Sequence, residues 1–149
     1  MRVVVQKVSS SKVTVDGEVI GSIDRGFNLL IGFCKDDTLE DLIYIKDKVL
    51  NLRVFEDEND KLNLSLLDVK GDILAISQFT LYGDCRKGRR PNFMNAMGGE
   101  EAKELYEKFV SMLKESGLKV EMGMFGAHMM VDINNDGPVT ILVDSKKDF

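Results

Sequence analysis

The chain has 149 residues, a formal net charge of −5 and a hydrophobic fraction of 44%. This length predicts a single domain, residues 1–149, which buries close to ~70% of its unfolded-chain surface and needs no disulfide to hold it together. The composition excludes a disordered or fibrous chain, the net negative charge excludes general coating of nucleic acid, and two cysteines are too few for a disulfide framework or a thiolate metal site.

The first part of the chain is predicted to be antiparallel β-structure. β-Branched runs lie on both sides of Ser9–Ser11, and Asp16-Gly17 is a strong hairpin signal before a strand over 18–23. A central strand follows over 27–34. Within it, Gly32 marks either a bulge or a close approach of two backbones.

Two amphipathic helices are predicted, each with one apolar face that packs on the sheet. The first covers 39–50, where apolar residues recur at helical spacing and Asp36-Asp37-Thr38 supplies an N-cap and favourable charge. The second covers 100–116, with acidic residues in its first turn. Between the helices, 52–55 is predicted to be a short strand, and 61–67 is either a brief strand or an irregular segment.

The last part of the chain returns to strands over 118–122, 128–133 and 139–143, with a dense turn signal at 134–138. Strands, helix, strands, helix and strands in this order predict an α+β domain. We expect a curved, mostly antiparallel sheet, resembling a β-barrel, with two helices packed outside it. The chain lacks regular βαβ alternation and a glycine-rich phosphate fingerprint, which argues against a Rossmann-type nucleotide domain.

The stretch after a predicted buried strand over 73–76 changes from apolar to polar. Ser77, Gln78 and Thr80 place hydroxyl and amide groups where the core pattern predicts apolar side chains, and Phe79 lies among them. Such hydroxyls commonly satisfy neighbouring backbone groups, and such a phenylalanine commonly fills a core. The alternative is a site at the strand end that binds an anionic ligand and acts on it.

A basic loop follows, in which Arg86, Lys87, Arg89 and Arg90 place four cations within five residues. Charge runs are usually solvated, but this run in an acidic chain suits contacts with phosphate groups. No aromatic side chain lies among the four cations, which favours contacts with a nucleic-acid backbone over the reading of bases. The segment 91–97 is predicted to form a short helical turn.

Gly137-Pro138 is the second candidate site, whereas the single histidine, His128, is a weak one. A glycine before proline permits a rigid turn whose main-chain carbonyls exclude substrates by shape, and a plain tight turn is the alternative. His128 precedes an apolar run, so we expect a partly buried strand residue. With one histidine and no thiolate cluster, the sequence predicts neither a Ser-His-Asp triad nor a zinc site.

These segments together resemble a known family. Ser77–Leu81, followed by Arg89–Phe93 and by Asn135–Thr140 near the end, is similar to the D-aminoacyl-tRNA deacylases, also called D-tyrosyl-tRNA deacylases. The likeness runs from Met1 to about Val143. It implies a homodimeric, cofactor-free editing enzyme that hydrolyses the ester between a D-amino acid, or glycine, and tRNA.

The resemblance also implies roles for the candidate residues. Ser77–Thr80 of one subunit faces the Gly137-Pro138 turn of the other, whose peptide bond is cis in the family and whose carbonyls reject L-amino acids. Main-chain N–H groups around Phe79 and Thr80 would stabilise negative charge on the substrate carbonyl, as an oxyanion hole does. Ser77 and Gln78 would position the terminal adenosine and the ester. Phe125 matches a family position beside the pocket, although its side chain alone suggests only packing.

The sequence leaves the nucleophile and two other classes of function open. Thr80 is either a nucleophile or a positioning group, and because no base lies near it in sequence, we favour assistance by the vicinal ribose hydroxyl of the substrate RNA. The alternatives are a non-catalytic module that binds the tRNA acceptor stem and a purely structural homodimer. No signal peptide and no run of about 18 apolar residues occur, so we expect a cytoplasmic protein without a membrane partner.

Overall fold

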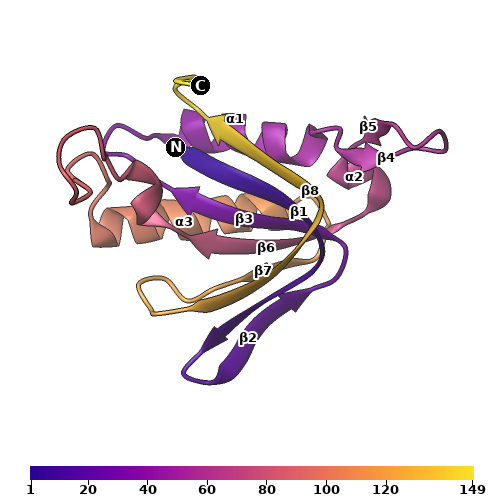
Figure 1. Ribbon diagram of the computed structural model, residues 1–149, viewed down its shortest axis with the longest axis horizontal. Coiled ribbons are helices and arrows are strands. Elements are labelled where there is room, and N and C mark those ends of the chain that lie inside the picture. Colours follow the sequence, from indigo (N-terminus) through magenta and orange to yellow (C-terminus); the bar gives the residue numbers. More distant parts are fainter.

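The computed structural model describes residues 1–149, and one curved six-stranded sheet organises them (Figure 1). The strand order is β2-β1-β3-β6-β7, and β8 pairs with β1 as well. β1 is antiparallel to β2, β3 and β8, whereas β6 is parallel to both β3 and β7. These strands are β1 (Arg2–Val15), β2 (Glu18–Ile23), β3 (Gly26–Gly32), β6 (Asp72–Ser77), β7 (Val120–Met122) and β8 (Met130–Asp144).

The sheet is strongly curved and nearly closed. Gly21 of β2 lies so close to β7 that a Cβ atom at this glycine would be 3.1 Å from the carbonyl oxygen of Met122. No ladder joins these two strands, so the barrel stays open at this point. The predicted α+β class is therefore confirmed, with a parallel part around β6 that the hairpin signals did not indicate.

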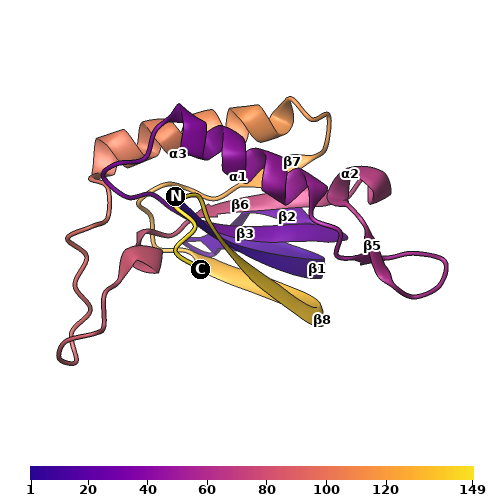
Figure 2. The same cartoon turned by 90° about the horizontal axis from the view of Figure 1, so that it is seen from above.

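Two long helices cover one face of the sheet, as predicted (Figure 2). They are α1 (Leu39–Asn51) and α3 (Gly99–Lys114). Helix α1 begins with a capping box, in which the Asp41 carboxylate accepts the Thr38 N–H at 2.8 Å, so that two otherwise unpaired groups are satisfied. No helix of the structure is long and apolar enough to cross a membrane.

The region between the long helices contains short elements that the periodicity could not resolve. A two-stranded hairpin is formed by β4 (Phe55–Glu56) and β5 (Leu62–Leu64), and α2 (Leu66–Val69) follows. Helix α2 starts at Ser65, whose hydroxyl accepts the Asp68 N–H at 3.1 Å. A helix of four residues depends on such a cap because it forms too few hydrogen bonds of its own to offset the cost of nucleation. It is also too short to show a repeating apolar face, so the periodicity could not reveal it.

Two predicted interruptions of strands are wrong, because the chain continues as a strand through both. β1 passes through the three serines, where its partner changes from β3 to β2. The Ser11 hydroxyl is buried and donates to the Asp132 carbonyl at 2.8 Å, so the polar side chain is satisfied inside the sheet. The second interruption, the turn at 134–138, lies within β8 as a bulge.

The β8 bulge contains Gly137-Pro138, whose peptide bond is cis. The pairing with β1 shifts register here, because Gln6 opposes Thr140 while Val8 opposes Asn135. The Asn135 side chain closes the bulge: its amide donates to the main-chain carbonyls of Lys7 at 2.9 Å and Val139 at 3.0 Å. The bulge is therefore held by a side chain rather than by ladder bonds alone.

The main hydrophobic core lies between the sheet and the two long helices, and a smaller cluster fills the inside of the curve. β6 contributes to both, because Ile73 and Ala75 face the helices while Leu74 and Ile76 face the inside. The predicted buried strand over 73–76 is thereby confirmed. Since β6 is fixed from both faces, the segment that follows it is held at a defined position.

Candidate active site

β6 is followed at once by a short 3₁₀ helix, η1 (Phe79–Tyr82), which is packed against the end of β3. The Gln78 N–H donates to the Ile31 carbonyl at 2.6 Å. Gly32 allows this approach, because a Cβ atom there would lie 2.8 Å from the Gln78 carbonyl oxygen. The close backbone approach at Gly32, one of the two possibilities raised by the sequence, is therefore what the structure has.

The start of η1 presents main-chain donors. The Leu81 N–H donates to the Gln78 carbonyl at 3.3 Å, which is the first hydrogen bond of this helix. The N–H groups of Phe79 and Thr80 precede it and take no part in the helical hydrogen bonds. They are suited to an acceptor that comes from outside the chain.

A cleft of about 570 Å³ adjoins this turn, between the ends of β3 and β6, the start of α3 and the loop that joins β7 to β8. Ten of its sixteen lining residues are hydrophobic, and His128 is the only one with a titratable side chain. The lining comprises Ile31, Gly32, Phe33, Ile76, Ser77, Gln78, Phe79, Met97, Gly99, Ala102, Phe125, Gly126, Ala127, His128, Met129 and Val131.

The structure brings together four of the residues singled out from the sequence, since Ser77, Gln78, Phe79 and Phe125 all line the cleft. Thr80 does not line it. The Gln78 side-chain amide donates to the Thr80 hydroxyl, so this threonine orients Gln78 at the edge of the cleft.

Phe79 is not a core residue: 58% of it is exposed. Its ring meets the Phe93 ring edge-on, with 5.2 Å between the centroids and 69° between the planes. The common reading of a phenylalanine as core is wrong here because the chain has already left the buried strand when it reaches this position. The exposed pair forms an aromatic surface at the cleft.

Tyr106 supports the wall of the cleft and was not predicted from the sequence. It lies on α3 with no exposed surface, its hydroxyl donates to the Ala75 carbonyl at 2.7 Å, and its ring centroid is 5.8 Å from that of Phe125. Burial raises the pKa of Tyr106, so the hydroxyl stays protonated as the donor. The helical spacing predicted that one face of α3 packs on the sheet, but it did not single out Tyr106.

His128 is exposed and precedes β8, so the prediction of a partly buried strand histidine is wrong. The strand begins two residues later, at Met130, after a loop in which Gly126 has a positive φ of 78°. The apolar residues after His128 made the strand seem to start early. The loop instead places His128 among the residues that line the cleft.

The Gly137-Pro138 turn does not line the cleft of its own chain. Within one chain, the two candidate sites are therefore separate. Beneath the turn, Lys7 is 1% exposed, and its Nζ lies 2.6 Å from Glu56 Oε1 and 4.0 Å from Asp136 Oδ2. This buried lysine ties the bulge to the β4–β5 hairpin.

The basic loop lies on a projecting segment, residues 83–96, that we call the arm; Figure 2 shows it extending away from the sheet. Backbone hydrogen bonds between Asp84 and Asn92 (2.8 and 2.9 Å) join its two sides. The guanidinium of Arg86 binds the Asp84 carboxylate at 2.7 and 2.9 Å and holds the pKa of that carboxyl at about 2. The remaining cations of the loop are exposed and form no ion pair: Lys87, Arg89 and Arg90.

The short helical turn predicted over 91–97 is confirmed only in part, because the segment has one hydrogen-bonded turn within this range and is otherwise extended. The Ala96 N–H donates to the Phe93 carbonyl at 3.0 Å. The segment then pairs with the residues after β3, where the Met97 N–H donates to the Phe33 carbonyl at 2.9 Å. These tertiary hydrogen bonds replace helical ones and hold the arm beside the cleft.

The chain is similar to known proteins over nearly its whole length. The family model described as D-Tyr-tRNA(Tyr) deacylase matches residues 4–144. The chain is 74% identical to a D-aminoacyl-tRNA deacylase of Clostridium beijerinckii and 71% identical to one of Clostridium perfringens, each over 149 residues and the full length of both chains.

Solved structures are similar over nearly the whole chain. One titled c-Myc DNA Unwinding Element Binding Protein is 44% identical, with a TM-score of 0.91 over 97% of this chain and 98% of the other. A probable eukaryotic D-amino acid tRNA deacylase shares the fold, with a TM-score of 0.82 at 20% identity over 95% and 97% of the two chains. The cleft, the family match and the full-length relatives lead to one conclusion: this chain belongs to the D-Tyr-tRNA(Tyr) deacylase family, whose members are hydrolases of D-aminoacyl-tRNA.

Proposed function

We propose that the chain works as a homodimer whose active site combines the cleft of one subunit with the Gly137-Pro138 turn of the other, and that it hydrolyses D-aminoacyl-tRNA and glycyl-tRNA. The observation that carries this proposal is the pair of free main-chain donors at Phe79 and Thr80 beside an apolar cleft. Such donors stabilise the negative charge that develops on an ester carbonyl oxygen during hydrolysis.

The chemistry of the cleft supports assistance by the substrate RNA. Apart from His128, no lining side chain can accept a proton near neutral pH, and the Thr80 hydroxyl is occupied by Gln78. The ribose hydroxyl next to the ester can orient a water molecule that attacks the carbonyl carbon. The ester C–O bond then breaks, the ribose oxygen takes a proton, and the products are a free amino acid and tRNA.

Selection of the D-enantiomer follows from a rigid wall. The β8 bulge is held by Asn135 and by buried Lys7, so its main-chain carbonyls keep their place when a substrate enters. An L-side chain that points at this wall is rejected sterically, which discriminates more strongly than a pocket that merely lacks one favourable contact. Glycine has no side chain to reject, so glycyl-tRNA is a second substrate.

The arm supplies the contacts with the tRNA acceptor stem in this proposal. Lys87, Arg89 and Arg90 are exposed and free to bind phosphates, whereas Arg86 is already neutralised by Asp84. Replacing the three free cations should weaken tRNA binding more than replacing Arg86. This difference also separates the proposal from a purely structural dimer, for which none of the four matters.

The proposal is tested by the deacylation of matched D- and L-tyrosyl-tRNA. We expect rapid release of D-tyrosine, and of glycine from glycyl-tRNA, but little release of L-tyrosine. Equal hydrolysis of both enantiomers would refute the steric exclusion of L-amino acids. Binding of tRNA without turnover would instead support a non-catalytic RNA-binding module.

The route of hydrolysis is tested with two variants and one altered substrate. If the RNA assists, Thr80→Ala and His128→Ala retain most of kcat, whereas D-tyrosyl-tRNA with a 2′-deoxy terminal adenosine is not hydrolysed. Loss of activity in Thr80→Ala with full activity on the deoxy substrate would establish a threonine nucleophile. A comparable loss in His128→Ala alone would identify the histidine as the base.

A further inference from the structure

A second cleft, of about 890 Å³, neighbours the first. It lies between the residues that follow β3, the base of the arm and the C-terminal tail. Two stretches of chain run from one cleft to the other. Gly32 and Phe33 line the first cleft while Lys35 lines the second, and Phe79 lines the first while Tyr82 lines the second. An extended ligand that leaves the first cleft along η1 therefore reaches the second.

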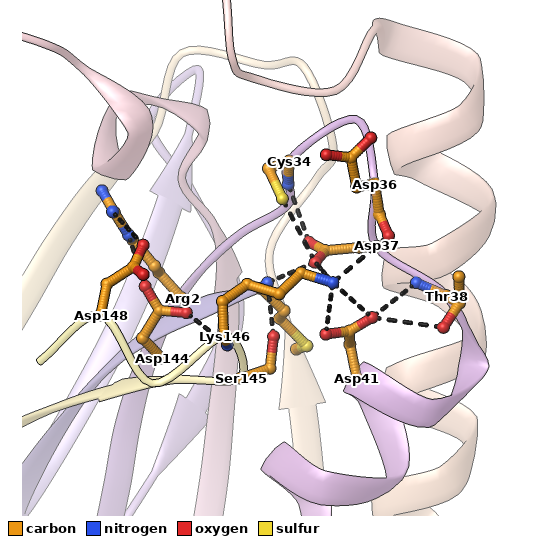
Figure 3. Close-up of polar contacts among 11 residues, drawn as sticks. Arg2, Cys34, Asp36, Asp37, Thr38, Asp41, Asp144, Ser145, Lys146 and Asp148 are labelled. Atoms are coloured by element: carbon orange, nitrogen blue, oxygen red, sulfur yellow. Dashed lines mark hydrogen bonds and ion pairs between the residues drawn. The ribbon is translucent and has the colours of Figure 1, made fainter.

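Arg2 is the central cation of this second cleft. Its guanidinium lies over the Tyr82 ring at 4.6 Å and over the Phe149 ring at 5.5 Å. One nitrogen donates to the Leu81 carbonyl at 3.2 Å, so that Arg2 is joined directly to η1. Two carboxylates pair with it, at 3.0 Å from Asp144 and 3.5 Å from Asp148, as Figure 3 shows.

The two carboxylates differ in how firmly they are held. The Asp144 side chain is 1% exposed, so its pair with Arg2 is part of the folded structure. The Asp148 side chain is 61% exposed and sits near the end of the tail. An exposed ion pair at 3.5 Å adds little stability and is readily exchanged for another anion.

Tail residues Asp148 and Phe149 thus offer one guanidinium an anion and an aromatic ring. A nucleotide offers the same pair of groups, since its phosphate binds arginine and its base stacks on the guanidinium plane. We propose that the second cleft binds the nucleotide that precedes the terminal adenosine of the RNA substrate. Its phosphate takes the place of Asp148 at Arg2, and its base takes the place of the Phe149 ring.

The other cations of the cleft indicate which residue assists Arg2. Arg86 is paired with Asp84, and Lys146 Nζ lies 2.9 Å from Asp41 and 3.6 Å from Asp37. Lys35 is exposed, lines the cleft and forms no ion pair. It is the cation that is free to approach the same phosphate.

This inference rests on the proposed function, and the test separates the two by means of two substrates. D-Aminoacyl-tRNA extends through the second cleft, whereas 3′-O-D-aminoacyl-adenosine ends before it. We expect Lys35→Ala to raise KM for the tRNA substrate about fivefold, the loss of one charged contact, without a change in kcat or in KM for the adenosine substrate. Asp148→Asn should lower KM for tRNA about two- to threefold, because it removes a competitor of the phosphate.

Salt dependence and a matched lysine variant complete the test. Lys35→Ala should reduce the slope of log K against log salt for tRNA binding by about 0.7, the value for one phosphate of a single strand. Lys108→Ala, which removes an exposed lysine on α3, should change none of these quantities. Equal effects of Lys35→Ala on both substrates, or no effect on either, would overturn the nucleotide subsite.

Failure of the proposed function has a different signature, in which the wild-type protein hydrolyses neither substrate. In that case the nucleotide subsite is tested by measuring the binding of a short single-stranded RNA that ends in adenosine. Weaker binding by Lys35→Ala and stronger binding by Asp148→Asn would support the subsite without catalysis. Unchanged binding by both variants would overturn it.

Discussion

Gly32 decides, at the scale of a single residue, whether the cleft can form. A Cβ atom at this position would lie 2.8 Å from the Gln78 carbonyl oxygen and 3.1 Å from the Leu81 Cβ atom, and neither can move without shifting η1. We expect Gly32→Ala to lower the free energy of unfolding by about 1–3 kcal/mol, the usual cost of overpacking. We also expect the deacylation rate to fall by more than the loss of folded protein explains. Chemical denaturation and the deacylation rate, measured on the same samples, check this.

Gly98 is the matched control for this substitution. It precedes α3 with a φ of −68°, and nothing lies within 4 Å of an added Cβ atom. Gly98→Ala should lower the free energy of unfolding by less than about 1 kcal/mol, because alanine is a poorer N-cap than glycine but meets no neighbouring atom here. Similar losses of activity in both variants would contradict a specific role for the close approach at Gly32.

The carboxylate of Asp41 makes the stability of the fold depend on pH (Figure 3). Burial by itself raises the pKa of Asp41, but hydrogen bonds from Ser145, the Thr38 N–H and Lys146 outweigh burial and hold that pKa well below its usual range. A carboxyl whose pKa is depressed by folding stabilises the fold above its unfolded pKa, about 3.9, and this stabilisation is lost as the pH falls below that value.

We therefore expect Asp41→Asn to lower the Tm at pH 7 and pH 5, and the difference from the wild type to narrow steadily below about pH 4. Thermal unfolding between pH 2.5 and pH 7 measures it. Asp47→Asn, at an exposed position of the same helix, should give almost no difference at any pH. If the difference in Tm between Asp41→Asn and the wild type stayed constant over the whole pH range, the charge of the carboxylate would not be the cause of the lower stability.

The β8 bulge is the element on which selectivity depends in the proposed function. Asn135 donates to Lys7 and Val139 and accepts from the Thr140 hydroxyl at 3.1 Å, so it closes both ends of the bulge. Asn135→Ala leaves the core intact but frees the carbonyls of the turn to move. We expect the ratio of kcat/KM for D- over L-tyrosyl-tRNA to fall at least about tenfold, the equivalent of about 1.4 kcal/mol of differential binding.

The neighbouring asparagine supplies the comparison. The Asn134 side chain donates only to the Ser10 hydroxyl, at 2.6 Å, and forms no hydrogen bond with the main chain of the bulge. Asn134→Ala should leave the ratio of the two rates unchanged. If both variants lost selectivity equally, the loss would come from a general change in β8 rather than from the hydrogen bonds of Asn135.

At the scale of the whole molecule, the separation of the two candidate sites within one chain predicts complementation between subunits. Gln78→Ala damages the cleft, and Gly137→Ala places a Cβ atom 2.8 Å from Val139 Cγ2 at a φ of 121° and so damages the turn. A mixed dimer of these variants contains one site with an intact cleft and an intact turn. After subunit exchange, we expect about a quarter of wild-type activity, since half the dimers are mixed and each has one complete site.

Measurement of D-tyrosyl-tRNA hydrolysis before and after mixing tests this expectation, with each variant mixed with itself as the control. Recovery in the mixture alone means that the two segments act across subunits. If neither the mixture nor the controls recover, each site is built within one chain, and the proposed homodimeric site is wrong.

Local chemistry determined much of the architecture. The spacing of apolar residues over 39–50 and 100–116 gave both long helices, because one helix repeat is short enough to be visible within each segment. The same holds for the buried strand over 73–76. At Gly32 the sequence left a bulge and a close backbone approach open, and the packing of η1 decided between them. Ser77, Gln78 and Phe79 were singled out by the change from apolar to polar residues after the buried strand, whereas Phe125 was found only through the family resemblance.

Tertiary contacts decided what remained. The strand β1 continues through its serines because Ser11 finds a hydrogen-bond partner, Asp132, that lies 121 residues away. The strand β8 continues through its bulge because Asn135 bonds to Lys7. The exposure of Phe79 and the placement of His128 depend in the same way on where β6 ends and β8 begins. A sequence window records the propensity of its own residues, whereas these outcomes depend on hydrogen-bond partners and neighbouring surfaces that only the folded chain brings within reach.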